Sequence, residues 1–162
     1  MNNRPPYDAK LPSMIRKSQL IAVALMLGVI AFGLIAVFIG GKVKPATPIM
    51  AYLAVAFAAQ VIALRFFIPG LVVKSQLEEM KDEGTSSVAE RLQGLFQIKV
   101  IIGMALLEGA ALFNLIAYIA NGQWFSLATA GFLLVLIGMM FPTMHAFESW
   151  IEDVERNMDS HF

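Results

Sequence analysis

The sequence predicts an all-α, polytopic integral membrane protein with four transmembrane helices. Hydrophobic residues make up 58% of the 162 residues and charged residues only 15%, against about 45–50% and 25% in soluble domains. The apolar residues come in long blocks, which short segments rich in proline, glycine or charge separate. At a rise of about 1.5 Å per residue, a helix of about 20 residues matches the hydrocarbon core of a bilayer. Membrane-spanning helices are therefore the expected architecture.

The first two predicted spans are residues 19–39 and 48–67. A secretory signal peptide would have an apolar region of only about 7–15 residues before a cleavage site. Residues 19–39 form a longer uncharged run, and Gly40-Gly41-Lys42 follows it, so we expect a retained helix. Pro48 suits the first turn of the second helix, and we expect Pro69-Gly70 to break or kink that helix.

The third predicted span is Lys99–Gly122. Glu108 is the only residue of 100–120 that can carry a charge. A capping box that begins at Ser87 predicts a helix that starts at Val88 and continues into this span.

The fourth predicted span is 125–141. Pro142 should end or kink it, and a polar helix is expected over 145–158. Trp124 suits the membrane interface, and Trp150 could anchor the polar helix at the surface.

These segments divide the chain into five parts: a cytoplasmic N-terminal segment (1–18), a first transmembrane hairpin (19–67), a cytoplasmic helical connector (68–98), a second transmembrane hairpin (99–141) and a cytoplasmic C-terminal helix (142–162). Only Lys42 and Lys44, of 12 lysines and arginines, fall in the outer connectors. Because positive residues accumulate on the cytoplasmic side, both termini are predicted to be cytoplasmic.

An internal repeat relates the first and third spans. A shift of half the chain length sets Ser18–Gly41 over Lys99–Gly122. Identical residues then recur at Ile21/Ile102, Ala24/Ala105, Leu25/Leu106, Gly28/Gly109, Phe32/Phe113, Leu34/Leu115, Ile35/Ile116, Ala36/Ala117 and Gly41/Gly122. Two readings stay open: duplication of one helical hairpin, or identities that any two apolar helices share by composition.

Glu108 is the leading candidate site residue. A carboxyl deep in a span costs at least a few kcal/mol, so it must be protonated, paired or facing a polar cavity. In one interpretation it takes up and releases a proton. In the other it is a structural carboxyl hydrogen-bonded to Gln60, at similar depth on the neighbouring helix, or to Asn114, nearly two turns along the same helix.

The stretch around this residue, ALLEGAALFNLIA at 105–117, resembles the carboxylate helix of the rotary-ATPase proteolipids, the c-type subunits of F- and V-type enzymes. Those helices place a glutamate among alanines with an aromatic residue five positions on. The V-type proteolipid is similar in being a duplicated four-helix chain of about this length. The resemblance implies that Glu108 is an ion-binding carboxylate and Gln60 its neighbour.

Other chemistry has less support in the sequence. The chain has no cysteine and a net charge of zero, which gives no basis for thiolate metal sites or nucleic-acid binding. Met139, Met140, Met144 and His145 lack regular ligand spacing and are expected to pack or to lie at a helix end. His145, Glu148 and Glu152 share one helix face, which we expect to be solvated rather than to bind metal. No cofactor site or enzymatic activity is predicted.

The predicted function is that of an accessory or assembly subunit that associates with other membrane subunits or with itself. Small residues let helices approach closely in lipid. Those expected to face neighbouring helices are Ala54, Ala58, Gly103, Gly109, Gly131 and Gly138. The alternative is a proton- or cation-handling, proteolipid-like protein that uses Glu108. An enzyme with its site at the cytoplasmic surface is the third and weakest hypothesis.

Overall fold

The computed structural model describes residues 11–40, 47–80 and 85–159 and is all-α over these ranges. Its helices there are α1 (Leu11–Gly40), α2 (Ile49–Met80), α3 (Thr85–Asn121), α4 (Trp124–Met139) and α5 (Met144–Asp159). The all-α part of the predicted fold class is confirmed. The predicted polar C-terminal helix corresponds to α5, and the predicted helix start at Val88 lies in the first turn of α3.

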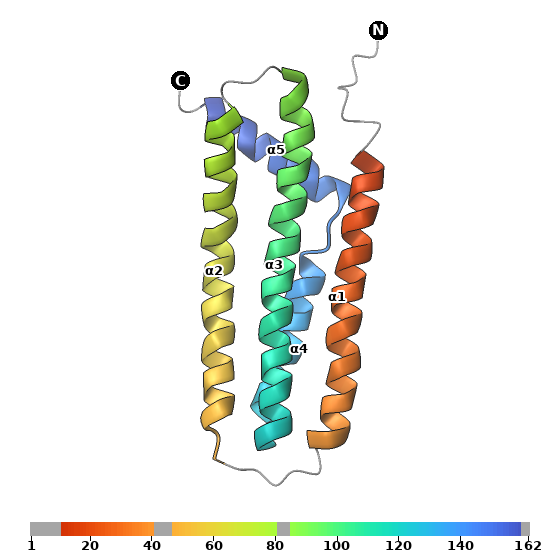
Figure 1. Ribbon diagram of the computed structural model, residues 1–162, viewed down its shortest axis with the longest axis vertical. Helices are drawn as coiled ribbons and strands as arrows, with labels where there is room; N and C mark the ends of the chain where they lie inside the picture. Colours follow the sequence, from red (N-terminus) through yellow and green to blue (C-terminus); the bar gives the residue numbers. More distant parts are fainter. Residues whose placement is uncertain (1–10, 41–46, 81–84, 160–162) are drawn as a thin grey trace.

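Helix α3 is the centre of the bundle. Figure 1 shows α1, α2 and α3 side by side, with α3 between the other two, α4 behind α3 and α5 across one end. Helix α3 packs extensively against α1, α2 and α4, and α4 makes smaller contacts with α1 and α2. The two helices of the predicted first hairpin, α1 and α2, therefore pack mainly on α3 and not on each other.

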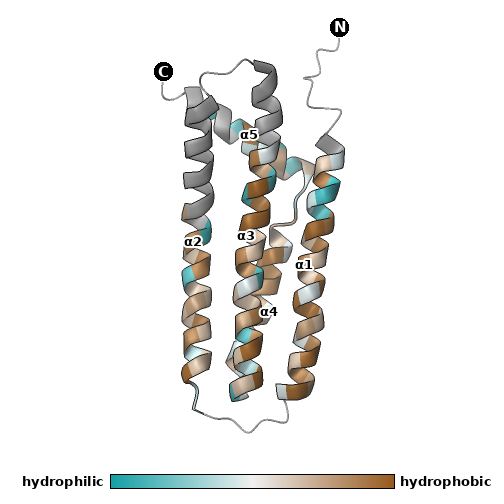
Figure 2. Cartoon of the chain, in the orientation of Figure 1, coloured by the Kyte–Doolittle hydropathy of each residue, from teal (hydrophilic) through white to brown (hydrophobic). Residues whose placement is uncertain are grey.

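Small side chains line the interior of this bundle, and large apolar side chains cover its outside. On α1, Ala22 and Ala36 are fully buried, whereas Leu20, Leu27 and Leu34 are 58–71% exposed. Figure 2 shows hydrophobic colouring along the described lengths of α1 to α4, with hydrophilic residues gathered near α5 and the start of α1. An outer surface as apolar as the core is typical of helices in lipid, because there burial from water does not decide which face turns inward.

Two helices are long and apolar enough to cross a membrane, Ser13–Gly40 and Gly94–Asn121. Trp124–Met139 and Met144–Glu152 pass the same criteria only together, and they are bent by 74° at the break between them. Ile49–Arg65 is a shorter apolar helix. The structure thus supports two or three candidate spans, and the count of four stays a prediction.

Helices α1 and α3 run in the same direction and are closely in register (Figure 1). A Cβ atom on Gly33 would lie 3.8 Å from Leu115 Cδ1, and one on Gly40 would lie only 2.6 Å from Tyr118 Cε1. The glycine at position 40 is therefore required for the close approach of α1 to the Tyr118 ring. This register is within three residues of the half-chain shift that aligns the two segments in sequence.

The chain breaks between α4 and α5 at the predicted proline. Helix α4 has 16 residues, or about 24 Å. Gln19 Nε2 of α1 donates a hydrogen bond to the Pro142 carbonyl at 3.0 Å, and Thr143 Oγ1 accepts one from the Ala146 N–H at 3.2 Å. Both bonds satisfy backbone groups that the break leaves without a helical partner. Side chains of this sequence therefore stabilise the break.

Two of the predictions about helix ends and anchors are corrected. Pro69-Gly70 does not break α2, which runs through both residues, since a proline removes only one backbone hydrogen bond and neighbouring groups can compensate. A kink at this point stays a prediction. Trp150 is only 9% exposed and packs against Phe96 of α3, with ring centroids 5.6 Å apart. The 74° bend turns α5 over the bundle end, so this tryptophan meets protein. Trp124, in contrast, is 74% exposed, as an interfacial residue would be.

Within the single chain, the predicted contact with neighbouring helices is confirmed for three of the small residues and wrong for the other three. Ala54, Ala58 and Gly103 are buried, and a Cβ on Gly103 would lie 2.8 Å from Met140 Cε. The residues that instead face outward are Gly109, Gly131 and Gly138, where a Cβ would meet nothing within 4 Å. The spacing of small residues along the sequence could not distinguish the inward-facing from the outward-facing ones, because a small residue fits equally well inside a bundle or on its surface.

Candidate functional site

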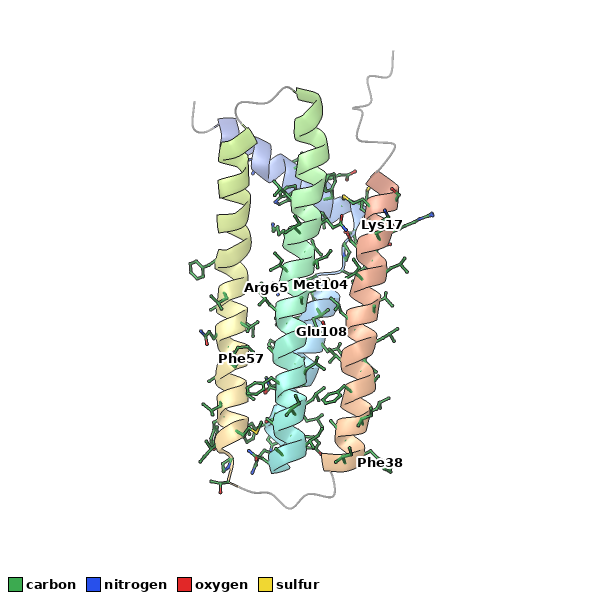
Figure 3. The ribbon with its side chains drawn as sticks, in the orientation of Figure 1. Lys17, Phe38, Phe57, Arg65, Met104 and Glu108 are labelled. Atoms are coloured by element: carbon green, nitrogen blue, oxygen red, sulfur yellow. The ribbon has the colours of Figure 1, made fainter. Side chains whose placement is uncertain are left out.

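Glu108 lies at the midpoint of the candidate span Gly94–Asn121 and is half-buried. Figure 3 shows it on the side of α3 that faces α1. A Cβ atom on Gly28 of α1 would lie 3.4 Å from Glu108 Oε1, so the carboxyl rests against a place where α1 has no side chain. Gly28 is itself within two residues of the midpoint of Ser13–Gly40. The Glu108 carboxyl therefore lies at the level of the midpoints of both candidate spans.

The two predicted neighbours of this carboxyl do not lie with it. Asn114 is fully buried, and its Nδ2 donates to the Ala54 carbonyl of α2 at 3.0 Å and to the Ala110 carbonyl at 2.9 Å. Gln60 is an exposed residue of α2, on the opposite flank of α3 from α1. Within the described chain, no hydrogen bond joins Glu108 to either of them. Asn114 instead links α3 to α2.

Small exposed residues surround Glu108. Ala24 and Gly28 are four apart on α1, Ala105 and Gly109 are four apart on α3, and all four are exposed. Residues four apart share one helix face, so each helix presents an alanine–glycine pair to the outside. These two pairs and Glu108 together form a surface that we call the Glu108 face. The sequence contains both pairs as matched repeat positions, but it did not show that they lie on adjacent parallel helices.

The Glu108 face can do two things chemically. A protonated carboxyl both donates and accepts hydrogen bonds, and alanine and glycine let another helix backbone come close enough to use them. The same carboxyl could exchange a proton. The two side chains predicted as its neighbours supply it with no oxygen atom, because Gln60 is exposed on α2 and Asn114 bonds to α2.

A second polar group of residues lies inside the bundle where α2, α3 and α4 meet. Asn114 Oδ1, Asn121 Nδ2 and Ser126 Oγ are buried without a hydrogen-bond partner. Asn121 and Ser126 were missed as candidates in the sequence. The spacing of seven that puts Asn121 on the same face as Asn114 was the available indication.

The methionine, histidine and acidic residues singled out in the sequence lie around the break between α4 and α5. His145, Glu148 and Glu152 are exposed on α5, as predicted for a solvated face. Over the part of the chain that the structure describes, no group of three histidine, aspartate or glutamate residues could hold a metal ion. Met140 points at Gly103, whereas Met139 is 78% exposed.

Comparisons with protein families, with curated proteins and with solved structures found no match. The likeness of residues 105–117 to the proteolipid helix therefore rests on that stretch alone.

Proposed function

We propose that this chain is a four-span integral membrane protein that acts through lateral association, as an accessory or assembly subunit, with the Glu108 face as its contact surface. The observation that carries this proposal is a half-exposed carboxyl at mid-span, framed by four exposed small residues from two helices. A polar group in hydrocarbon without a partner is costly. A second helix that supplies hydrogen-bonding groups at this depth would remove that cost.

The proposed topology puts both termini and residues 68–98 in the cytoplasm. The start of α1, the end of α2, the start of α3 and helix α5 lie at one end of the bundle (Figure 1). Eight of the 12 lysines and arginines belong to the segments proposed to be cytoplasmic, and Arg65 and Lys99 lie at the ends of the two spans that adjoin residues 68–98. This distribution favours the proposed orientation.

Reporter fusions at residues 45, 85, 122 and 162 test the four spans. We expect cytoplasmic signals at 85 and 162 and external signals at 45 and 122, because four crossings return the chain to its starting side. A cytoplasmic signal at 122 would contradict the arrangement of the second hairpin.

Association is tested by Gly109→Leu, with Ala59→Leu as the matched control. The Asn114–Ala54 bond aligns α3 with the antiparallel α2, so Gly109 and Ala59, five residues from each, lie at similar depth. Both are exposed, but only Gly109 belongs to the Glu108 face. Gly109→Leu should weaken association at least about tenfold, which corresponds to ~1.4 kcal/mol. The measurement is the mass of the complex extracted in mild detergent, and equal effects of the two changes would contradict the proposed surface.

The alternative function, proton or cation handling, uses the same carboxyl. It is favoured by the partial exposure of Glu108, because a partner at this face could exchange a proton with the carboxyl. The two functions differ in the behaviour of Glu108→Gln, since an amide keeps the hydrogen bonds but cannot cycle a proton.

A further inference from the structure

The polar junction between α2, α3 and α4 has hydrogen-bonding groups that the protein does not use. Asn114 and Ser126 are fully buried and Asn121 is 8% exposed. Each has one polar atom without a partner: Asn114 Oδ1, Asn121 Nδ2 and Ser126 Oγ. Buried polar groups are nearly always hydrogen-bonded, so three in one region require an explanation.

These residues belong to the same half of the bundle. Asn114 and Asn121 are seven residues apart on one face of α3, about 10 Å along its axis. Ser126 lies on the buried face of α4, directly after the turn at Gly122. The Asn114–Ala54 bond and the stacked rings of Tyr52 and Phe125, 5.5 Å apart, bring the start of α2 to the same place.

The buried residues near this junction have small side chains. Ala51 and Ala54 of α2 and Ala117 of α3 are fully buried, and Ala130 of α4 is 2% exposed. Alanine side chains fill less of the space between helices than larger apolar residues would, so small residues here are compatible with a buried water beside the unpaired polar atoms. A buried water needs such room and two to four polar partners.

We infer that the junction binds a short file of water molecules, which enters from the end of the bundle that carries Gly122 and reaches Asn114. The unpaired atoms decide the ligand class. A cation could not accept the hydrogen bond of Asn121 Nδ2, and an anion could not donate one to Asn114 Oδ1. Water does both, and it does so whichever way the Asn121 amide is turned. Because water is neutral, the site needs no charged residue to bind it.

The absence of cysteine from the chain makes single cysteines a direct probe of this water. A thiol reacts as thiolate, which forms in contact with water and not in an apolar seam. Ala117→Cys places the probe between Asn114 and Asn121 on the same face of α3. Ala36→Cys is the matched control, because it is also fully buried and the Gly33–Leu115 contact puts it at similar depth, on the seam between α1 and α3.

Modification by a small, water-soluble methanethiosulfonate should be at least about tenfold faster at Ala117→Cys than at Ala36→Cys, because only the former thiol can ionise. Ser126→Cys, a nearly isosteric change, should also react fast and covers the case in which Ala117→Cys does not fold. Slow reaction at both junction positions would overturn the inference. Equally fast reaction at Ala36→Cys would overturn it too, since the whole bundle would then be open. The result does not depend on the Glu108 face, so it can fail while the proposed function holds.

Discussion

Replacing Ala54 by leucine should lower the free energy of unfolding by about 1–3 kcal/mol, as overpacking of a filled site does. The same replacement at Ala56 should change it by less than about 0.5 kcal/mol. Ala54 is fully buried and its carbonyl accepts the Asn114 bond at 3.0 Å, whereas Ala56 is exposed on the same helix. A larger side chain at Ala54 would push α2 away from α3 and stretch that bond.

The measurement for this pair is reversible unfolding in detergent, followed by the loss of helix signal. Both variants gain the same apolar volume, so any difference between them reports on packing and not on hydrophobicity. Equal losses would show that α2 does not use this seam against α3.

Glu108→Leu should reduce association at least about tenfold (~1.4 kcal/mol), whereas Glu108→Gln should keep it. If Glu108 were a structural carboxyl bonded to Gln60 or Asn114, leucine would also destabilise the single chain by leaving that neighbour unpaired. The structure removes that expectation, because Asn114 bonds to α2 and Gln60 is exposed. The folded monomer should therefore tolerate both changes, with stability within about 0.5 kcal/mol of the wild type.

The same series separates the two proposed functions. If the protein acts through association, Glu108→Gln is active and Glu108→Leu is not. If it handles protons, Glu108→Gln associates normally but is inactive. Loss of both association and stability in Glu108→Gln would contradict the placement of the carboxyl on an exposed face.

The sequence was sufficient for helix content, for the break at Pro142 and for the position of the central carboxyl, because length, proline and charge are read directly from the chain. It was not sufficient for which face of each helix turns inward. Both faces of a helix in lipid are apolar, so the exposed Leu27 and the buried Ala22 of α1 differ in size and not in polarity. The alanines repeated along α1 were the feature of the sequence that indicated its inward face.

The relation between α1 and α2 could not be read from the sequence either. A short connector suggests that two helices pack together, but α3 lies between them (Figure 1). For this reason Gln60, predicted as a neighbour of Glu108, lies on the other flank. The sequence matches Ala24 and Gly28 to Ala105 and Gly109 as repeat positions, but only the structure places them on adjacent, parallel helices (Figure 1).

The most direct test of the Glu108 face is photo-cross-linking in native membranes. A photoreactive phenylalanine analogue replaces Ile116, which is 44% exposed and lies seven residues beyond Gly109 on the same face of α3. The control replaces Val135, another β-branched residue, 61% exposed on α4 behind α3. A protein adduct at Ile116, weak or absent at Val135 and reduced by Glu108→Leu, is the predicted result. Equal adducts at both positions, or none at Ile116, would contradict association through this face.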